Sequence, residues 1–366
     1  MEIFRFTDGC QDNFGDDLNR WMWKRLLNCS FSPHDGVLML GVGTVISRNF
    51  IPAMANYLVV SSGVGYDAPP EDFGGPKWKI LSVRGPMTAQ ALGLPPESAI
   101  IDGAVLLRLL PECEPLPESE RKGIVFMPHY ESLRTGNWQR VCDMAGIEFL
   151  DPRGDSEIMV QRIRKARLVI ADAMHAAIVA DALRVPWIPV VTSPQSSTFK
   201  WLDWTLSLDL PYRPVDLPAS TWLEFYRRNS FGFYGQKFYL KNATPHKALR
   251  HYRRVRKIES WRFTPSARLH VVHLTWSLPK RIITSGVLRR RKREEDERRT
   301  CLAAESLARA AASPPYLSNE GKFNQRLGQM KLMLQKLRNG LLAQTDFSLS
   351  EDRMSEKEAS CLTPLS

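Results

Sequence analysis

The segment 168–191 constrains the fold of this chain most, because it reads as strand, turn, helix and strand in quick succession. Residues 168–171 and 188–191 are apolar runs of strand length, and residues 176–183 have the composition of a short helix. Buried strands that alternate with helices predict a parallel sheet covered on both faces. The turn 172–175 then follows the carboxyl end of a strand, where ligands bind in open α/β sheets.

Met174 and His175 lie in this turn, just before the predicted helix. A helix N-terminus offers free N–H groups and a positive dipole end to an anion. An imidazole there donates a hydrogen bond or transfers a proton near neutral pH. We expect Met174 to contact substrate and His175 to be catalytic, and a simple helix cap is the alternative for His175.

The same alternation of strands and helices runs on both sides of a proline- and acid-rich break at 111–117. It predicts an α/β, GT-B-like fold with two Rossmann-like parallel-sheet domains facing each other across a cleft. We place these domains at 1–115 and 118–215. A basic helical C-terminal extension at 216–343 and a disordered tail at 344–366 are expected to follow.

A polar loop follows the first predicted strand and opens a predicted helix at 18–27. In it Asn13 and Gly15 are candidates to contact substrate, since glycine lets backbone approach a ligand closely. Asp16 and Asp17 are candidate catalytic carboxylates, able to hold sugar hydroxyls or accept a proton. Capping of the helix is the alternative for one of them.

Two further strand ends in the first half carry charged side chains. Arg84 follows the strand predicted at 79–83 and suits a carboxylate or phosphate, although a surface arginine fits equally. Asp102 ends a fifth strand predicted at 99–102 and is either a substrate-binding or a turn residue.

In the second half, His129 follows a strand and is expected to face the same cleft as the histidine at 175. Lys200 follows the strand 188–191, between aromatic residues, and is a candidate substrate-binding residue. Trp201 and Trp204 either stack on a sugar ring or belong to a core helix.

Several functional classes lack their signatures. The chain has no Gly-x-Gly-x-x-Gly, no Walker loop, no His-Glu-x-x-His and no Gly-x-Ser-x-Gly. Its six cysteines include no Cys-x-x-Cys pair, so neither a metal site nor a disulfide framework is expected, and the reducing cytoplasm is the expected compartment.

The net charge of +11 is concentrated between residues 227 and 299. A basic surplus attracts polyanions, and a solvated helix face is the alternative. Because no aromatic-rich nucleic-acid module accompanies it, we expect peripheral association with an anionic membrane and no nucleic-acid partner.

Five stretches together resemble the polysaccharide pyruvyl transferase family, in particular the succinoglycan type of exopolysaccharide ketal-forming enzyme. The stretches are Asn-Phe-Gly-Asp-Asp-Leu-Asn at 13–19, Arg-Gly-Pro-Met-Thr-Ala at 84–89, Ile-Asp-Gly-Ala-Val-Leu-Leu at 101–107, Met-Pro-His-Tyr at 127–130, and the run 172–186. One departure is Ala176, where the family usually has glycine.

The resemblance implies transfer of the pyruvyl group of phosphoenolpyruvate, as co-substrate without a further cofactor, onto a hexose of a lipid-linked oligosaccharide. The product is a cyclic pyruvate ketal, and phosphate is released at the cytoplasmic face of the inner membrane. In this scheme Arg84 and His175 bind the donor, His175 protonates its methylene carbon, and Asp16 or Asp17 handles the acceptor hydroxyls.

Two alternatives stay open from the sequence. A GT-B glycosyltransferase that uses a nucleotide sugar would share the cleft and the positive helix end. A non-catalytic adaptor of a polysaccharide assembly complex would use the basic helices as its working surface and bind no small anion.

Overall fold

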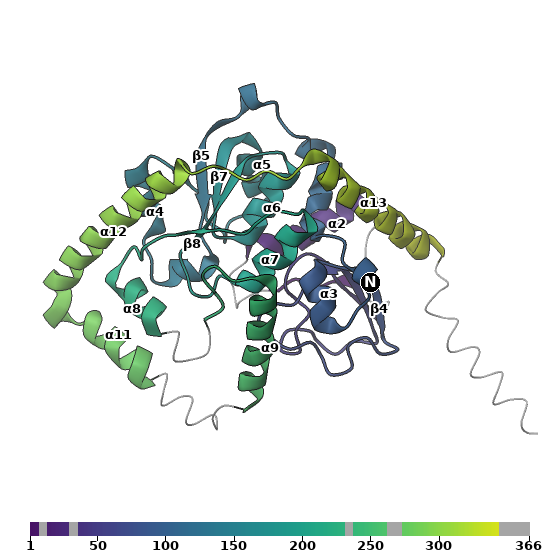
Figure 1. Ribbon diagram of the computed structural model, residues 1–366, viewed down its shortest axis with the longest axis horizontal. Helices are drawn as coiled ribbons and strands as arrows, with labels where there is room; N and C mark the ends of the chain where they lie inside the picture. The colour runs from purple at the N-terminus through teal and green to yellow at the C-terminus, as the bar shows by residue number, and fades with distance from the viewer. Residues whose placement is uncertain (7–12, 29–35, 231–236, 262–272, 344–366) are drawn as a thin grey trace, which may run out of the picture.

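The computed structural model describes residues 1–6, 13–28, 36–230, 237–261 and 273–343, so the tail predicted at 344–366 lies outside the described residues. Two parallel sheets with flanking helices form the body of the molecule, and further helices follow on its periphery (Figure 1). The predicted α/β, GT-B-like architecture is confirmed. Among the described residues, no helix is both long and apolar enough to cross a membrane.

The first sheet has four parallel strands in the order β1-β2-β3-β4. Their bounds are Glu2–Ile3, Val37–Leu40, Asn56–Ser62 and Trp78–Val83. The helical segments of this half are α1 (Phe14–Asp17), η1 (Leu18–Arg20), α2 (Met22–Leu27), α3 (Pro86–Leu92) and the 3-10 helices η3 (Pro96–Ser98), η4 (Gly103–Leu109), η5 (Pro111–Cys113) and η6 (Glu118–Glu120). The single helix predicted at 18–27 is thus two short segments, η1 and α2, and α1 precedes them.

The fifth strand predicted at 99–102 is wrong. Only one isolated bridge forms there, between Val83 and Ala99. The side chain of Asp102 accepts a hydrogen bond from the Ala104 N–H and so turns the chain into η4. Because this cap starts a helical segment, the chain leaves the sheet before a second strand pair is made.

The second sheet has five parallel strands in the order β6-β5-β7-β8-β9. In chain order β5 to β9 span Lys122–Met127, Glu148–Phe149, Ala166–Ala171, Trp187–Val191 and Val215–Asp216. The helical segments of this half are η7 (Tyr130–Arg134), α4 (Trp138–Ala145), α5 (Ser156–Lys165), α6 (Met174–Ala182) and α7 (Thr198–Ser207). Helix α6 starts two residues earlier than predicted, so its first turn includes His175.

The helices after residue 216 pack back onto both halves. They are α8 (Trp222–Ser230), α9 (Pro245–Trp261), the π-helical turn η9 (His273–Ser277), α11 (Leu278–Ile283), η10 (Gly286–Leu288), α12 (Arg289–Ala311) and α13 (Glu320–Ala343). Helix α12 packs on α4, α9 packs on α3 and α7, and α13 contacts η4. Figure 1 shows α12 and α13 on opposite sides of the molecule.

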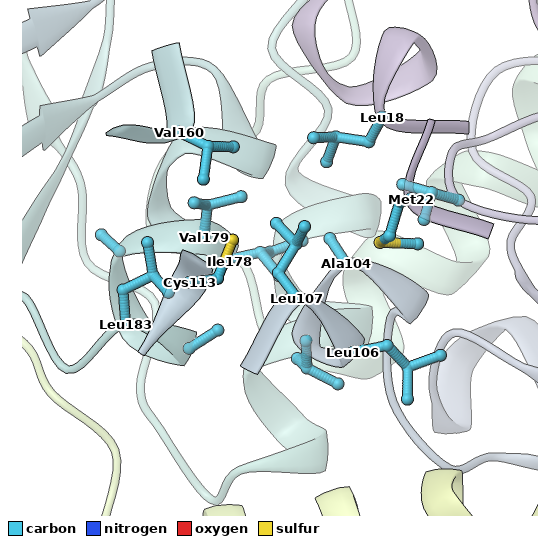
Figure 2. Close-up of a cluster of buried hydrophobic side chains, with 14 of the residues drawn as sticks. Leu18, Met22, Ala104, Leu106, Leu107, Cys113, Val160, Ile178, Val179 and Leu183 are labelled. Carbon is cyan, nitrogen blue, oxygen red and sulfur yellow. The ribbon is translucent and has the colours of Figure 1, made fainter. Parts of the chain in front are cut away.

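One hydrophobic cluster joins the two halves. Leu18, Met22 and Leu107 from the first half meet Ile178 and Val179 of α6 in a buried group (Figure 2). Each of these side chains is at most 1 % exposed. Because apolar burial stabilises by about 25 cal/mol per Å², this shared core fixes α6 against η4.

A buried ion pair makes a second connection. Arg84, at the end of β4, donates from Nε to Asp203 Oδ2 of α7 at 2.9 Å, and both side chains are 0 % exposed. The guanidinium also donates to Thr44 Oγ1 at 2.8 Å and to the Val64 carbonyl at 2.6 Å. Thr88 of α3 donates its N–H and hydroxyl to the same carboxylate. Arg84 therefore anchors α7 to the first half.

Removing this guanidinium tests the anchoring role. In Arg84→Ala the buried Asp203 carboxylate loses its counter-charge, so we expect the free energy of unfolding to fall by about 3–5 kcal/mol. Arg48→Ala is the control, because the Arg48 side chain is 39 % exposed and lies 3.8 Å from Asp67. An exposed ion pair of this kind contributes under about 1 kcal/mol to the free energy of unfolding. Urea denaturation followed by tryptophan fluorescence measures both, and a wild-type midpoint for Arg84→Ala would contradict the anchor.

Candidate functional site

A hollow between the two sheets gathers residues that follow the carboxyl ends of several strands. About 420 Å³ of space lies between its walls, including the part that opens to solvent. It is lined by Asn13, Phe14, Gly15, Tyr66, His129, Tyr130, Asp172, Ala173, Met174, His175, Ser196, Ser197, Lys200 and Trp201.

Parallel pairing explains why distant residues meet here. Strands β5 and β7 run in register until Met127 lies opposite Ala171. The segments that follow these two residues start at the same edge of the sheet, and they bring His129 beside the first turn of α6. The expectation that the histidines at 129 and 175 face one cleft is met by this geometry.

His175 lies in the first turn of α6, between an acid and a glycine. Its Nε2 is 3.6 Å from Asp102 Oδ2, and neither atom has a closer hydrogen-bond partner among the described residues. A Cβ on Gly15 would lie 1.8 Å from His175 Nδ1, so only glycine leaves space for the imidazole ring. The residue His175 is 7 % exposed.

Asp102 is suited to orient this imidazole. Burial acts to raise the pKa of Asp102, but the charge of His175, together with that of Arg84, outweighs burial, so the pKa lies below its ordinary value. An ionised carboxylate facing Nε2 favours a proton on that nitrogen, as the acid of a catalytic triad does.

Asp16 lies behind the wall of the hollow and has an unusual environment. Burial raises its pKa to about 6, against the charges of His175 and Lys200 and a hydrogen bond from Asn13. Asn13 Nδ2 donates to Oδ2 at 2.9 Å, whereas Oδ1 has no partner among the described residues. Oδ1 lies over Gly43, whose φ of +121° and close approach both require glycine. A carboxylate with a pKa near 6 can exchange protons at neutral pH.

Lys200 supplies a cation to the hollow from the first turn of α7. Burial and the charge of Arg84 lower its pKa to about 7, although Asp16 and Asp102 favour the charged form. Its Nζ donates to the Tyr66 hydroxyl at 3.3 Å and lies 4.6 Å from the centre of that ring. An incoming anion favours the protonated ammonium, because an opposite charge raises the pKa of a base.

Two helix N-termini open at the same place. The first residue before α6, Ala173, has no capping side chain, so the N–H groups of Met174 and His175 are available by their position in the helix. Helix α7 is capped by Ser197, which accepts from the Lys200 N–H at 3.4 Å. Both dipoles present their positive ends to the hollow and favour an anionic ligand.

His129 and Asp172 form the opposite wall. Burial and the positive charges of Lys200 and Arg227 lower the pKa of His129 to about 3, so this imidazole is neutral at pH 7. Its Nδ1 accepts from the Glu131 N–H at 3.3 Å, which leaves Nε2 as its donor. Burial raises the pKa of Asp172 to about 6, although that carboxylate accepts from the His129 N–H at 3.2 Å.

The hollow is not lined by four of the predicted site residues, namely Asp16, Asp102, Arg84 and Asp17. Arg84 lies behind the hollow, where its guanidinium pairs with Asp203, and it is not among the residues that line the hollow. Asp17 accepts from Arg5 and Arg20, each at 3.0 Å, and from Ser156 Oγ at 2.7 Å. Asp17 therefore holds α1 against α5, and the geometry favours Asp16 over Asp17 as the carboxylate near the hollow.

The aromatic residues after β8 belong mainly to the core. Trp204 is 0 % exposed, and Trp201 is 1 % exposed and stacks on Tyr212 at 5.0 Å while its edge borders the hollow. Five polar lining residues were not among the predicted site residues, namely Tyr66, Tyr130, Asp172, Ser196 and Ser197. The serine before the helical run at 198–207 is a recognisable N-cap signal that points to this position. Among the described residues, no group of three or more His, Cys, Asp and Glu side chains is arranged to hold a metal ion.

Gly15→Ala tests the packing of the imidazole. The added methyl overlaps His175, so the ring has to leave its place, and we expect a loss of about 1–3 kcal/mol in unfolding free energy. Gly286→Ala is the matched control, because no heavy atom lies within 4 Å of its added Cβ. Thermal and urea unfolding distinguish the two, and equal stability of both variants would show that the imidazole is not held against Gly15.

The lowered pKa of Lys200 predicts a pH dependence of stability. The folded pKa is about 7 and the ordinary value is 10.5, so between these values the unfolded chain binds more protons and wild-type stability rises with pH. Below pH 7 the burial cost of the charged amine is fully present. Lys200→Met removes this burial cost. Between pH 7 and pH 10 the free energy of unfolding of the wild type should therefore rise relative to that of the variant. Lys24→Met, on the exposed face of α2, should show no such trend, and a flat difference for Lys200→Met would contradict the lowered pKa.

Fold and hollow together define a GT-B-like α/β protein with a pocket between two parallel-sheet halves. Over 233 residues the chain is 41 % identical to the succinoglycan biosynthesis protein ExoV of Rhizobium meliloti (strain 1021), an alignment that covers 64 % of this chain and 73 % of that protein. The chain belongs to the family of that protein, and the resemblance to a succinoglycan-type family is confirmed. No family model and no solved structure matches the chain.

Proposed function

We propose that this protein acts in exopolysaccharide biosynthesis as a ketal-forming pyruvyl transferase. It takes the pyruvyl group from phosphoenolpyruvate, places it across two hydroxyls of a hexose in a lipid-linked repeat unit, and releases phosphate. The name of the relative from Rhizobium meliloti supports the polysaccharide pathway. The observation that carries the donor is the meeting of His175, Lys200 and two helix N-termini in one hollow.

Phosphoenolpyruvate is small and bears a phosphate and a carboxylate, so its site needs several fixed positive groups. Lys200 and the open N–H groups of Met174 and His175 supply them. Arg84 acts at one remove, since it fixes α7 through Asp203 and adds positive potential behind Lys200. This replaces the direct contact between Arg84 and donor that the sequence led us to expect.

In the first step the His175 imidazolium gives a proton to the methylene carbon, and the adjoining carbon becomes an oxocarbenium-like centre. Asp102 faces Nε2 and stabilises the imidazolium before transfer. In this scheme the proton comes from Nδ1, the ring nitrogen that does not face Asp102. One acceptor hydroxyl attacks the cationic carbon and gives up its proton to a base.

Asp16 lies just behind the wall of the hollow and is the proposed base, because its hydrogen-bond partner Asn13 lines the hollow and its pKa of about 6 suits proton exchange at neutral pH. Breaking the bond between carbon and phosphate oxygen then regenerates an oxocarbenium centre, which the second hydroxyl attacks. Of the two hydroxyl protons, one replaces the proton given to the new methyl group and one leaves with hydrogen phosphate, so the reaction is balanced. In this scheme neutral His129 donates a hydrogen bond from Nε2 to an acceptor hydroxyl, since its Nδ1 already accepts from the Glu131 N–H.

His175→Gln tests the acid directly. We expect phosphate release from phosphoenolpyruvate in the presence of a lipid-linked acceptor to fall about a hundredfold or more, because general acid catalysis contributes that much. The fold should be retained, as judged by circular dichroism and melting temperature. His246→Gln, on the exposed side of α9, is the matched control and should turn over as wild type.

Wild-type turnover by His175→Gln would remove this histidine from the mechanism. The glycosyltransferase alternative is separated by ligand-induced stabilisation. A rise in melting temperature with a nucleotide sugar, and none with phosphoenolpyruvate, would contradict the pyruvyl donor.

A further inference from the structure

We infer that residues 273–293 form a membrane-docking surface that binds the headgroup region of an anionic lipid bilayer. The surface consists of η9, α11, η10 and the start of α12. It lies at the lower left edge of the molecule in Figure 1, where α11 meets the end of α12 farthest from the sheets. The inference is independent of the proposed chemistry.

The apolar part of this surface is a stripe on one helical stretch. Leu274, Leu278 and Ile282 are 60 %, 42 % and 51 % exposed, and Val287 just beyond them is 92 % exposed. A spacing of four residues puts the first three on one side of a helix. Other large exposed apolar side chains among the described residues are scattered, whereas these four fall within fourteen consecutive positions. Exposure of such an apolar stripe to water is unfavourable, so the stripe marks an interaction surface.

The charge around the stripe identifies what covers it. Residues 273–293 contain seven basic side chains and no acid, namely Lys280, Arg281, Arg289, Arg290, Arg291, Lys292 and Arg293. Arg290 pairs with Glu294 at 2.9 Å and Lys292 pairs with Asp296 at 2.5 Å, one turn further along α12. Apolar side chains flanked by Lys and Arg are the pattern of helices that lie in the interface of anionic membranes.

The opposite side of the stretch is fixed to the body of the protein. Ile283 is 5 % exposed. The Trp276 ring stacks on the Tyr226 ring of α8, with 6.4 Å between the ring centroids, and the Tyr226 hydroxyl donates to the Thr275 carbonyl at 3.1 Å. The next residue of α8, Arg227, donates to Glu131 Oε2 at 2.6 Å, beside the His129 wall of the hollow. The docking surface is therefore held at a set position relative to the hollow.

Flotation of the full-length chain with lipid vesicles tests the inference. Wild type should float with vesicles that contain phosphatidylglycerol and not with phosphatidylcholine alone. The triple variant Leu274→Ser, Leu278→Ser, Ile282→Ser should lose about tenfold or more in apparent affinity through lost apolar burial, and Arg281→Gln, Arg289→Gln, Arg293→Gln a similar amount through lost charge.

Matched controls lie elsewhere on the surface. Leu332→Ser changes a leucine of α13 that is 61 % exposed, and Arg309→Gln changes an arginine at the other end of α12 with a side chain 70 % exposed. Both should float as wild type, and melting temperatures show that all variants are folded. Flotation of both triple variants as wild type would overturn the inference. So would wild type that binds single-stranded DNA but not the anionic vesicles.

Discussion

The hollow depends on one constraint, the fixed contact of two sheets that belong to different halves of the chain. A shared core between η4 and α6 makes this contact, and the Arg84–Asp203 pair completes it where both side chains are fully buried. A buried ion pair with one partner removed is strongly destabilised. The position of Lys200, three residues before Asp203 on α7, is therefore set by an arginine from the other half.

The same contact explains the protonation states in the hollow. Close packing removes water from a lysine, a histidine and two aspartates, and burial is the first cause of the shifted pKa at Lys200, His129, Asp16 and Asp172. Groups with separated or shifted pKa values next to one another are typical of proton-transfer sites. The pocket thus combines a cation near its titration point with a neutral imidazole and an exchangeable carboxylate.

Much of this was predictable from sequence, for physical reasons. The alternation around 168–191 fixes a parallel sheet, and strand ends in such a sheet meet at one edge, so His129, His175 and Lys200 were found together. The sequence does not show which side chain pairs with each charged residue in the folded protein. Nothing near Arg84 in the chain indicates Asp203, 119 positions away, or shows that Asp17 is occupied by Arg20 and Ser156. Similarly, the fifth strand predicted at 99–102 does not form, because the capping hydrogen bond of Asp102 starts η4 where the apolar run had favoured a strand.

The central claim is that this hollow binds a small doubly anionic donor between His175 and Lys200. A crystal structure of the protein with phosphoenolpyruvate measures it most directly. We expect the phosphate or carboxylate within hydrogen-bond distance of Lys200 Nζ and the N–H groups that open α6, with the methylene carbon against the His175 ring. A donor bound elsewhere, or an empty hollow at saturating phosphoenolpyruvate, would contradict it.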